Sequence, residues 1–172
     1  MIADEIAVAV GSAAAEEMSK ALERMKHCLA QLNDAQIWWR PQPSLNSIGN
    51  VILHLCGNLR QWVVAGLGGA ADNRNRPTEF SERGPITRDE LYRQLDAAVE
   101  ESRAVLARQT SAQLLAARCI QGFDVTGLGA IFDSVPHFRG HTQEIVHRTR
   151  LLLGERYQFQ WQPSSPEQGA PA

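Results

Sequence analysis

An apolar stripe with helical spacing runs along the beginning of this chain and limits what the chain can fold into. Its members are Met18, Leu22, Met25, Leu29 and Leu32. They lie alternately four and three residues apart, so all of them fall on one side of an α-helix. The spacing predicts a long amphipathic helix from about Asp4 to Leu32, whose apolar side must pack against other elements.

Three later segments repeat this pattern. A second helix is predicted over about Ser47–Gly66, and a fourth over about Gly129–Leu153, where Gly154 ends it. The third begins at Thr87, which is followed by Glu90 in the pattern of a capping box. The positions expected to face the core are Ile48, Ile52, Leu55, Leu59 and Val63 in the second helix, Leu91, Leu95, Ala98, Ser102 and Val105 in the third, and Ile131, Val135, Phe138, Thr142, Ile145 and Val146 in the fourth.

The connections between these helices differ in length and character. The stretch Leu67–Pro85 is rich in Gly, Asn, Arg and Pro, which predicts a long loop without helix. Such loops in compact domains are usually functional or disordered. Residues 110–128 are ambiguous, with Arg118–Val125 as a candidate for extended structure.

Together these features predict an all-α fold, a four-helix bundle with a long loop between its second and third helices. Because that loop could cross the bundle, an up-down-up-down order need not hold. No internal repeat or second domain is evident, so one domain is predicted over residues 1–162. The Pro, Ser, Gln and Gly content of residues 163–172 predicts a disordered tail.

Composition argues against several classes of partner. The formal net charge of −2 offers no electrostatic case for binding nucleic acid or an anionic membrane, and no apolar run is long enough to span a bilayer. The three cysteines, Cys28, Cys56 and Cys119, are scattered and odd in number, which is typical of reduced thiols in a cytoplasmic protein.

Three histidines predict a metal site. His137 and His141 are four residues apart, which places both imidazoles on one helix face. On a helical wheel they lie on one shoulder of the apolar arc, and His54 lies on the matching shoulder of the second helix. Two histidines from one helix and one from another would bind a divalent ion, most simply Zn²⁺ with Ni²⁺ or Fe²⁺ as alternatives, and leave a coordination position for water or substrate. His147 and His27 lie elsewhere.

A simpler interpretation remains open at this stage. An isolated helical histidine is usually a surface or hydrogen-bonded residue, and an H-x-x-x-H pair often arises by chance. A plain helical bundle without metal would show the same pattern, because the sequence alone does not place the second and fourth helices side by side.

Other polar residues near these positions are candidates for catalysis or binding. Asp133 and Glu144 share the stripe of the histidine pair and could orient an imidazole or relay a proton as catalytic groups, although a solvated helix face explains them equally well. Arg74 and Arg76, with Glu79 nearby in the long loop, could bind an anionic group of a substrate. Loop arginines are more often merely solvated.

One more polar residue, Asn58, lies beside His54 on the second predicted helix and is a further candidate for substrate binding. The Trp38-Trp39 pair, which precedes the second predicted helix, is better explained as packing in the core or at a dimer contact. Cys56 is better explained as a core residue.

Three stretches of the chain resemble a known family. They are Asn50–Arg60, Asn73–Phe80 and His137–Val146, which are similar to the DinB-like metalloprotein superfamily and most similar within it to a bacterial subfamily of unknown function. The resemblance implies an up-down-down-up four-helix bundle, often a homodimer, with a divalent metal held at His54, His137 and His141. Thr142-Gln143 departs slightly from the family pattern, which commonly has Gly before this glutamine.

The resemblance also implies two kinds of function. Characterised relatives include metal-dependent transferases that use low-molecular-weight thiols and a maleylpyruvate isomerase, so a thiol transferase or a hydrolase acting on a small-molecule substrate is expected. The alternative is a non-catalytic, metal-stabilised binding or dimerisation module. The two differ in whether the fourth coordination position of the metal is open.

Overall fold

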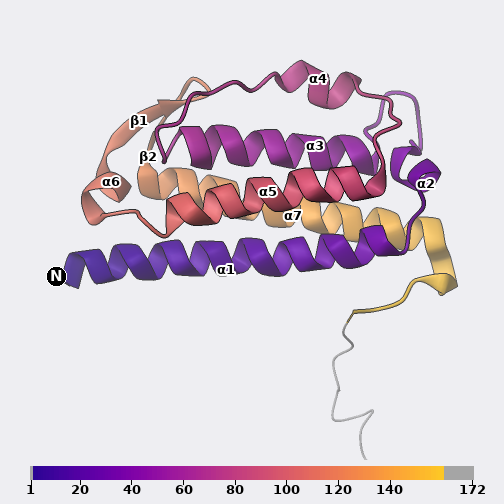
Figure 1. The fold of residues 1–172 in the computed structure, drawn as a ribbon, viewed down its shortest axis with the longest axis horizontal. Coiled ribbons are helices and arrows are strands. Elements are labelled where there is room, and N and C mark those ends of the chain that lie inside the picture. The colour runs from indigo at the N-terminus through magenta and orange to yellow at the C-terminus, as the bar shows by residue number, and fades with distance from the viewer. Residues whose placement is uncertain (1, 161–172) are drawn as a thin grey trace, which may run out of the picture.

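The computed structural model describes residues 2–160. The predicted end of the domain at residue 162 and the predicted disorder of 163–172 lie outside the described residues. Four long helices make up the molecule, and α3 is continued by a short π-helix, η1 (Figure 1). Their bounds are α1 Ile2–Ala30, α3 Ile48–Leu59, η1 Arg60–Ala65, α5 Arg88–Leu106 and α7 Gly127–Leu153.

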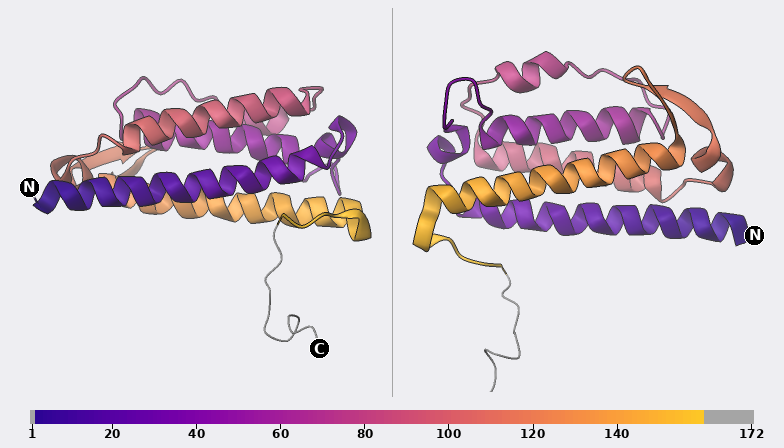
Figure 2. Two further views of the ribbon diagram at one scale, coloured as in Figure 1. Left: turned by 60° about the horizontal axis from the view of Figure 1, so that its bottom comes forward. Right: turned by 180° about the vertical axis from the view of Figure 1, so that it is seen from behind.

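The four helices form an up-down-down-up bundle. In Figures 1 and 2, α1 and α7 run in one direction and α3 and α5 in the opposite direction. Each of α1 and α3 packs against both α5 and α7, so α1 and α3 lie diagonally across the bundle. The connection between η1 and α5 runs the length of the bundle, which allows α3 and α5 to point the same way. The predicted fold class is confirmed.

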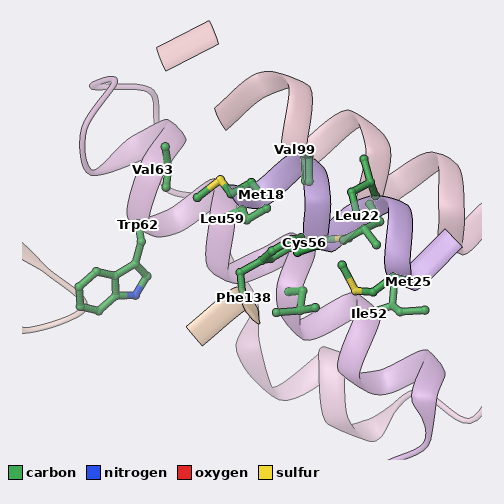
Figure 3. Packing of buried hydrophobic residues seen from close by; sticks show 14 of the residues in the cluster. Met18, Leu22, Met25, Ile52, Cys56, Leu59, Trp62, Val63, Val99 and Phe138 are labelled. Carbon is green, nitrogen blue, oxygen red and sulfur yellow. The ribbon is translucent and has the colours of Figure 1, made fainter. Parts of the chain in front are cut away.

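Apolar side chains from all four helices meet in one core. Figure 3 shows Phe138 of α7 among Met18 and Leu22 of α1 and Ile52 of α3. The stripe positions predicted for the first three helices are all buried, and Cys56 is part of the same core. Burial of this surface is the main force that holds such a bundle together. Within residues 2–160, every helix is too short or too polar to cross a membrane.

The ends of the bundle helices are set by capping residues. The Ser47 hydroxyl accepts a hydrogen bond from the Asn50 backbone N–H at the start of α3, and Oδ1 of Asn50 accepts one from the Ser47 backbone N–H. At α5 the Thr87 hydroxyl accepts from the Glu90 backbone N–H at 3.2 Å. The helix α7 ends at Gly154, whose φ of 56° suits a residue without a Cβ.

Several short elements fill the connections. They are α2 Asp34–Trp38, α6 Ser111–Leu115, the antiparallel strands β1 Ala117–Ile120 and β2 Phe123–Thr126, and the 3₁₀ turn η2 Gly154–Arg156. The strands confirm extended structure over most of Arg118–Val125. Their two-residue turn, Gln121-Gly122, has positive φ at both positions, as a tight hairpin turn requires.

The long connection also contains a helix, α4 Arg76–Ser81, which lies over α3 (Figure 1). The prediction that Leu67–Pro85 lacks helix is therefore wrong over these residues. A helix of this length is too short for a hydrophobic period to show in the sequence. Pro77 fits because it lies in the first turn, where a missing N–H breaks no helical hydrogen bond.

Candidate metal centre

Three histidines converge between α3 and α7. The imidazole centroids of His54 and His137 lie 5.1 Å apart, those of His54 and His141 5.2 Å, and those of His137 and His141 4.6 Å. One nitrogen from each of the three lies within 4.8 Å of the others. The helical-wheel prediction that these side chains meet is confirmed, because α3 and α7 are neighbours in the bundle.

The imidazole of His54 is oriented by a carboxylate from the long connection. Its Nδ1 lies 3.0 Å from Oε2 of Glu79 in α4. Arg74 Nη2 lies 3.1 Å from the same nitrogen and 2.9 Å from Oε2 of Glu79, to which it donates. With the Arg74 proton directed to the carboxylate, Nδ1 donates to Glu79 and Nε2 keeps its lone pair for a metal. The Phe80 ring packs on the same imidazole, with centroids 5.1 Å apart.

Glu79 is itself held in a buried ion pair. Its two oxygens accept from Nε of Arg74 at 2.7 Å and from Nη2 at 2.9 Å, and Arg74 Nη1 donates to Gln61 at 2.8 Å. The Arg74 side chain is 3% exposed and the Glu79 side chain 8%. Burial raises the pKa of Glu79, but the hydrogen bonds from Arg74 and His54 outweigh it and lower the pKa below its ordinary value.

A second carboxylate orients His141. Its Nδ1 lies 2.8 Å from Oε2 of Glu144, and Oε1 of Glu144 lies 2.7 Å from Nη2 of Arg148. Arg148 also donates to the Asn46 carbonyl just before α3. The hydrogen bond from His141 is the main cause of the lowered pKa of Glu144, and the Arg148 charge adds to it. Oε2 of Glu144 therefore orients the histidine, and Oε1 is held by Arg148.

His137 is held neutral by its surroundings. Burial, followed by the neighbouring His141 and His54 and the charges of Arg74 and Arg76, lowers its pKa to about 4. The neutral imidazole is the form that binds metal. At neutral pH this side chain needs to lose no proton before it coordinates an ion.

The donor set fits a divalent ion. Nε2 of His54 and Nε2 of His137 lie 3.0 Å apart. Two nitrogens bound to one tetrahedral zinc ion at about 2.0–2.1 Å are separated by about 3.3 Å, so a small adjustment would bring both into coordination. The other two histidines lie elsewhere, as expected. His147 is exposed, and Nε2 of His27 lies 2.6 Å from the Gln158 carbonyl oxygen.

A cavity of about 490 Å³ adjoins this centre. His54 and His137 form part of its wall, and it also contains Asn58, Arg74, Arg76 and Asp133, the other residues singled out in the sequence apart from Glu144. The Arg76 guanidinium lies 4.9 Å from the centroid of the Phe80 ring. The predicted binding residues and Asp133 thus line one cavity, where Arg74 is bonded to Glu79, whereas Glu144 lies outside it against His141.

Sequence reasoning missed several residues of this site. Glu79 was considered only as a neighbour of the loop arginines, and no local pattern links it to His54, 25 residues away. The cavity wall also includes Trp62, Ser134, Gln121 and residues 123–125 of the hairpin. A cluster of Arg and Glu in a polar loop was the one available signal for the ion pair.

Gly57 makes room for the Glu79 carboxylate. A Cβ at this position would lie 2.0 Å from Glu79 Oε1 and 3.0 Å from Arg74 Nε. We expect Gly57→Ala to push Glu79 away from His54 and to weaken metal binding about 10- to 100-fold, as loss of an orienting partner does. Isothermal titration with Zn²⁺ measures this.

Gly140 provides the matched control, because it lies in α7 between His137 and His141 and a Cβ there would meet nothing within 4 Å. Gly140→Ala should keep metal affinity and stabilise the helix by about 0.5–1 kcal/mol. Equal affinities for the two variants would contradict the role assigned to Gly57.

Comparisons with known proteins agree with this fold. The crystal structure of a conserved protein of locus from Enterococcus faecalis is similar, with a TM-score of 0.70 and 19% identity over 83% of this chain and 96% of that chain. At this identity the likeness concerns the fold alone. No curated protein matches the chain. A family model described as a protein of unknown function, DUF1572, matches residues 8–164, and the chain therefore belongs to the DUF1572 family.

Proposed function

We propose that this protein is a DinB-like metalloprotein that binds a divalent metal, most simply Zn²⁺, at His54, His137 and His141 and leaves one position open. The observation that carries the proposal is the convergence of three oriented imidazoles beside a cavity. Nitrogen donors suit Zn²⁺, and also Ni²⁺ or Fe²⁺. The resemblance of three stretches to the DinB-like superfamily supports the same assignment.

The surroundings of the histidines favour an open site over a closed structural one. A closed tetrahedral shell needs a fourth protein ligand. Glu79 and Glu144 are the carboxylates that contact these histidines, and each lies on the Nδ1 side of its histidine and is bonded to an arginine. A cavity adjoins His54 and His137 instead, with room for a small molecule.

The chemistry proposed for this site is activation of a bound water or low-molecular-weight thiol. A divalent ion with three neutral ligands keeps its full positive charge and lowers the pKa of a group bound in the fourth position. Within this scheme Arg76, which faces the cavity and is in an ion pair with no described residue, binds an anionic group of the substrate. Arg74 contributes by holding Glu79.

A cobalt-substituted sample tests the open position. We expect 2-mercaptoethanol to change the visible absorption spectrum, because a thiolate that enters the fourth position alters the ligand field of the ion. The titration is followed in the d–d and thiolate charge-transfer regions, with sodium azide as a second small ligand. A spectrum unchanged by every addition would instead favour a metal-stabilised module without catalysis.

The proposal extends to a homodimer. An apolar surface between α1 and α7 is lined by Val10, Ala13, Phe132, Val135 and Pro136, among others. Phe132 is 69% exposed, which is high for so large an apolar residue. A second copy of the chain would cover this surface.

A further inference from the structure

The cavity beside the histidines contains two carboxylates without partners. Asp124 of β2 and Asp133 of α7 both line it. Neither side chain makes a hydrogen bond or an ion pair with any of residues 2–160. Both aspartates are exposed, and Arg76, which lies over the Phe80 ring beside His54, lines the histidine end of the same cavity. The two carboxylates therefore make the opposite end its negative part, which attracts a positive charge.

Helix geometry places Asn58 and Asp133 about one turn away from the histidines. Asn58 follows His54 by four residues, and Asp133 precedes His137 by four. Because α3 and α7 run in opposite directions, both steps lead to the same end of the cavity. A step of four residues is about 6 Å along a helix axis.

Two buried oxygens at this end also lack partners. Oδ1 of Asn58 and Oγ of Ser134 have no hydrogen-bond partner among the described residues, although the residues are only 9% and 2% exposed. Both residues line the same cavity. A buried amide oxygen without a donor is costly, so this wall suits a ligand that brings N–H groups.

Aromatic rings complete this end of the cavity. Trp62 of η1 and Phe123 of β2 lie with ring centroids 6.2 Å apart. Trp62 Nε1 donates to Oε1 of Gln121 in the hairpin turn at 3.0 Å, which fixes the indole. Faces of aromatic rings attract cations as well as apolar groups.

We propose that this end of the cavity, defined by Asn58, Asp124, Asp133 and Ser134 with the two rings, binds an ammonium group of the substrate. The inference rests on the proposed function, because a second functional group of the same molecule is taken to bind at the open metal position. The one-turn separation fits a short linker of about two carbons between the metal-binding atom and the ammonium nitrogen. The substrate class is therefore a small amine whose second functional group is a metal ligand.

A matched pair of thiols tests the inference on the cobalt-substituted protein. Cysteamine and 2-mercaptoethanol share a two-carbon thiol and carry an ammonium or a hydroxyl group, and the ammonium also makes the cysteamine thiol more acidic and its amine a possible chelator. We therefore compare the preference for cysteamine in the unchanged protein with that in the double variant Asp133→Asn with Asp124→Asn. The preference should be about tenfold larger in the unchanged protein, because charge-assisted hydrogen bonds are made only there, and the cobalt content should be the same. Asp89→Asn is the control, since Asp89 lies at the exposed start of α5, outside the cavity, and should keep the preference.

A second pair of ligands separates the two proposals. Glycine hydroxamate and acetohydroxamate bind metals without a thiol and differ in the ammonium group. A preference for the ammonium member of this pair that falls in the double variant, with no response to either thiol, would refute the thiol chemistry and support the ammonium site. Preferences in both pairs that are the same in the unchanged protein and in the double variant would overturn the ammonium site, while a thiol response still supported the open metal position.

Discussion

Replacing any one of His54, His137 and His141 by Ala is expected to remove most of the bound metal. Each substitution deletes one of three ligands that converge within 4.8 Å, and two ligands hold an ion far more weakly than three. The loss should exceed the roughly 10- to 100-fold that follows removal of an orienting partner. Elemental analysis of untagged protein and competition with a zinc-binding dye measure it.

Two histidines outside the centre are the controls for this experiment. His147 is exposed on α7. His27 lies in the last turn of α1, where it contacts the Gln158 carbonyl oxygen. His147→Ala and His27→Ala should retain full metal content. Full occupancy in the His141→Ala protein would rule out the three-histidine centre.

Glu79→Ala is expected to have the largest effect on stability among the residues around the metal centre. The substitution leaves the Arg74 guanidinium, 3% exposed, without its carboxylate. An uncompensated buried charge costs about 3–5 kcal/mol, which chemical denaturation of the metal-free protein measures in the presence of a chelator. Metal affinity should fall as well, because His54 loses the group that orients it.

Two further variants separate these effects. Glu144→Ala removes the partner of His141, but the side chain is 32% exposed, so stability should fall by only about 1 kcal/mol or less while metal affinity falls. The double change of Arg74→Leu with Glu79→Leu removes both charges and should restore much of the stability without restoring affinity. An unaltered stability of Glu79→Ala would contradict the buried ion pair.

The bundle helices and the histidine cluster could be predicted from the sequence because both follow from helical periodicity. His137 and His141 lie on one helix, so their proximity is set by local geometry. His54 required the further condition that α3 and α7 are neighbours, which only the resemblance to a bundle family supplied. The helix start at Thr87 was likewise visible as a local capping pattern.

The surroundings of the cluster could not be predicted because they depend on the path of the long connection. Glu79 reaches His54 only because α4 lies over α3. Hydrophobic periodicity does not predict the path that a connection takes over the bundle. The hairpin wall has strands of four residues, too short for a clear alternation. At η1 a π-helix replaces the α-helical turn, so a wheel drawn at 100° per residue does not describe the position of Trp62.

The long connection that crosses the bundle gives the metal centre a thermodynamic role in the whole molecule. His54 and His137 are 83 residues apart, and Glu79 comes from the crossing segment between them, so an unfolded chain offers an ion no preformed site. An ion that binds only the folded state adds RT ln(1 + [M]/Kd) to the free energy of unfolding, about 2.7 kcal/mol at a hundredfold excess over Kd. The centre then acts as a reversible cross-link between distant segments. With a metal bound there, metal supply would set how often the chain opens to proteases, and hence its abundance.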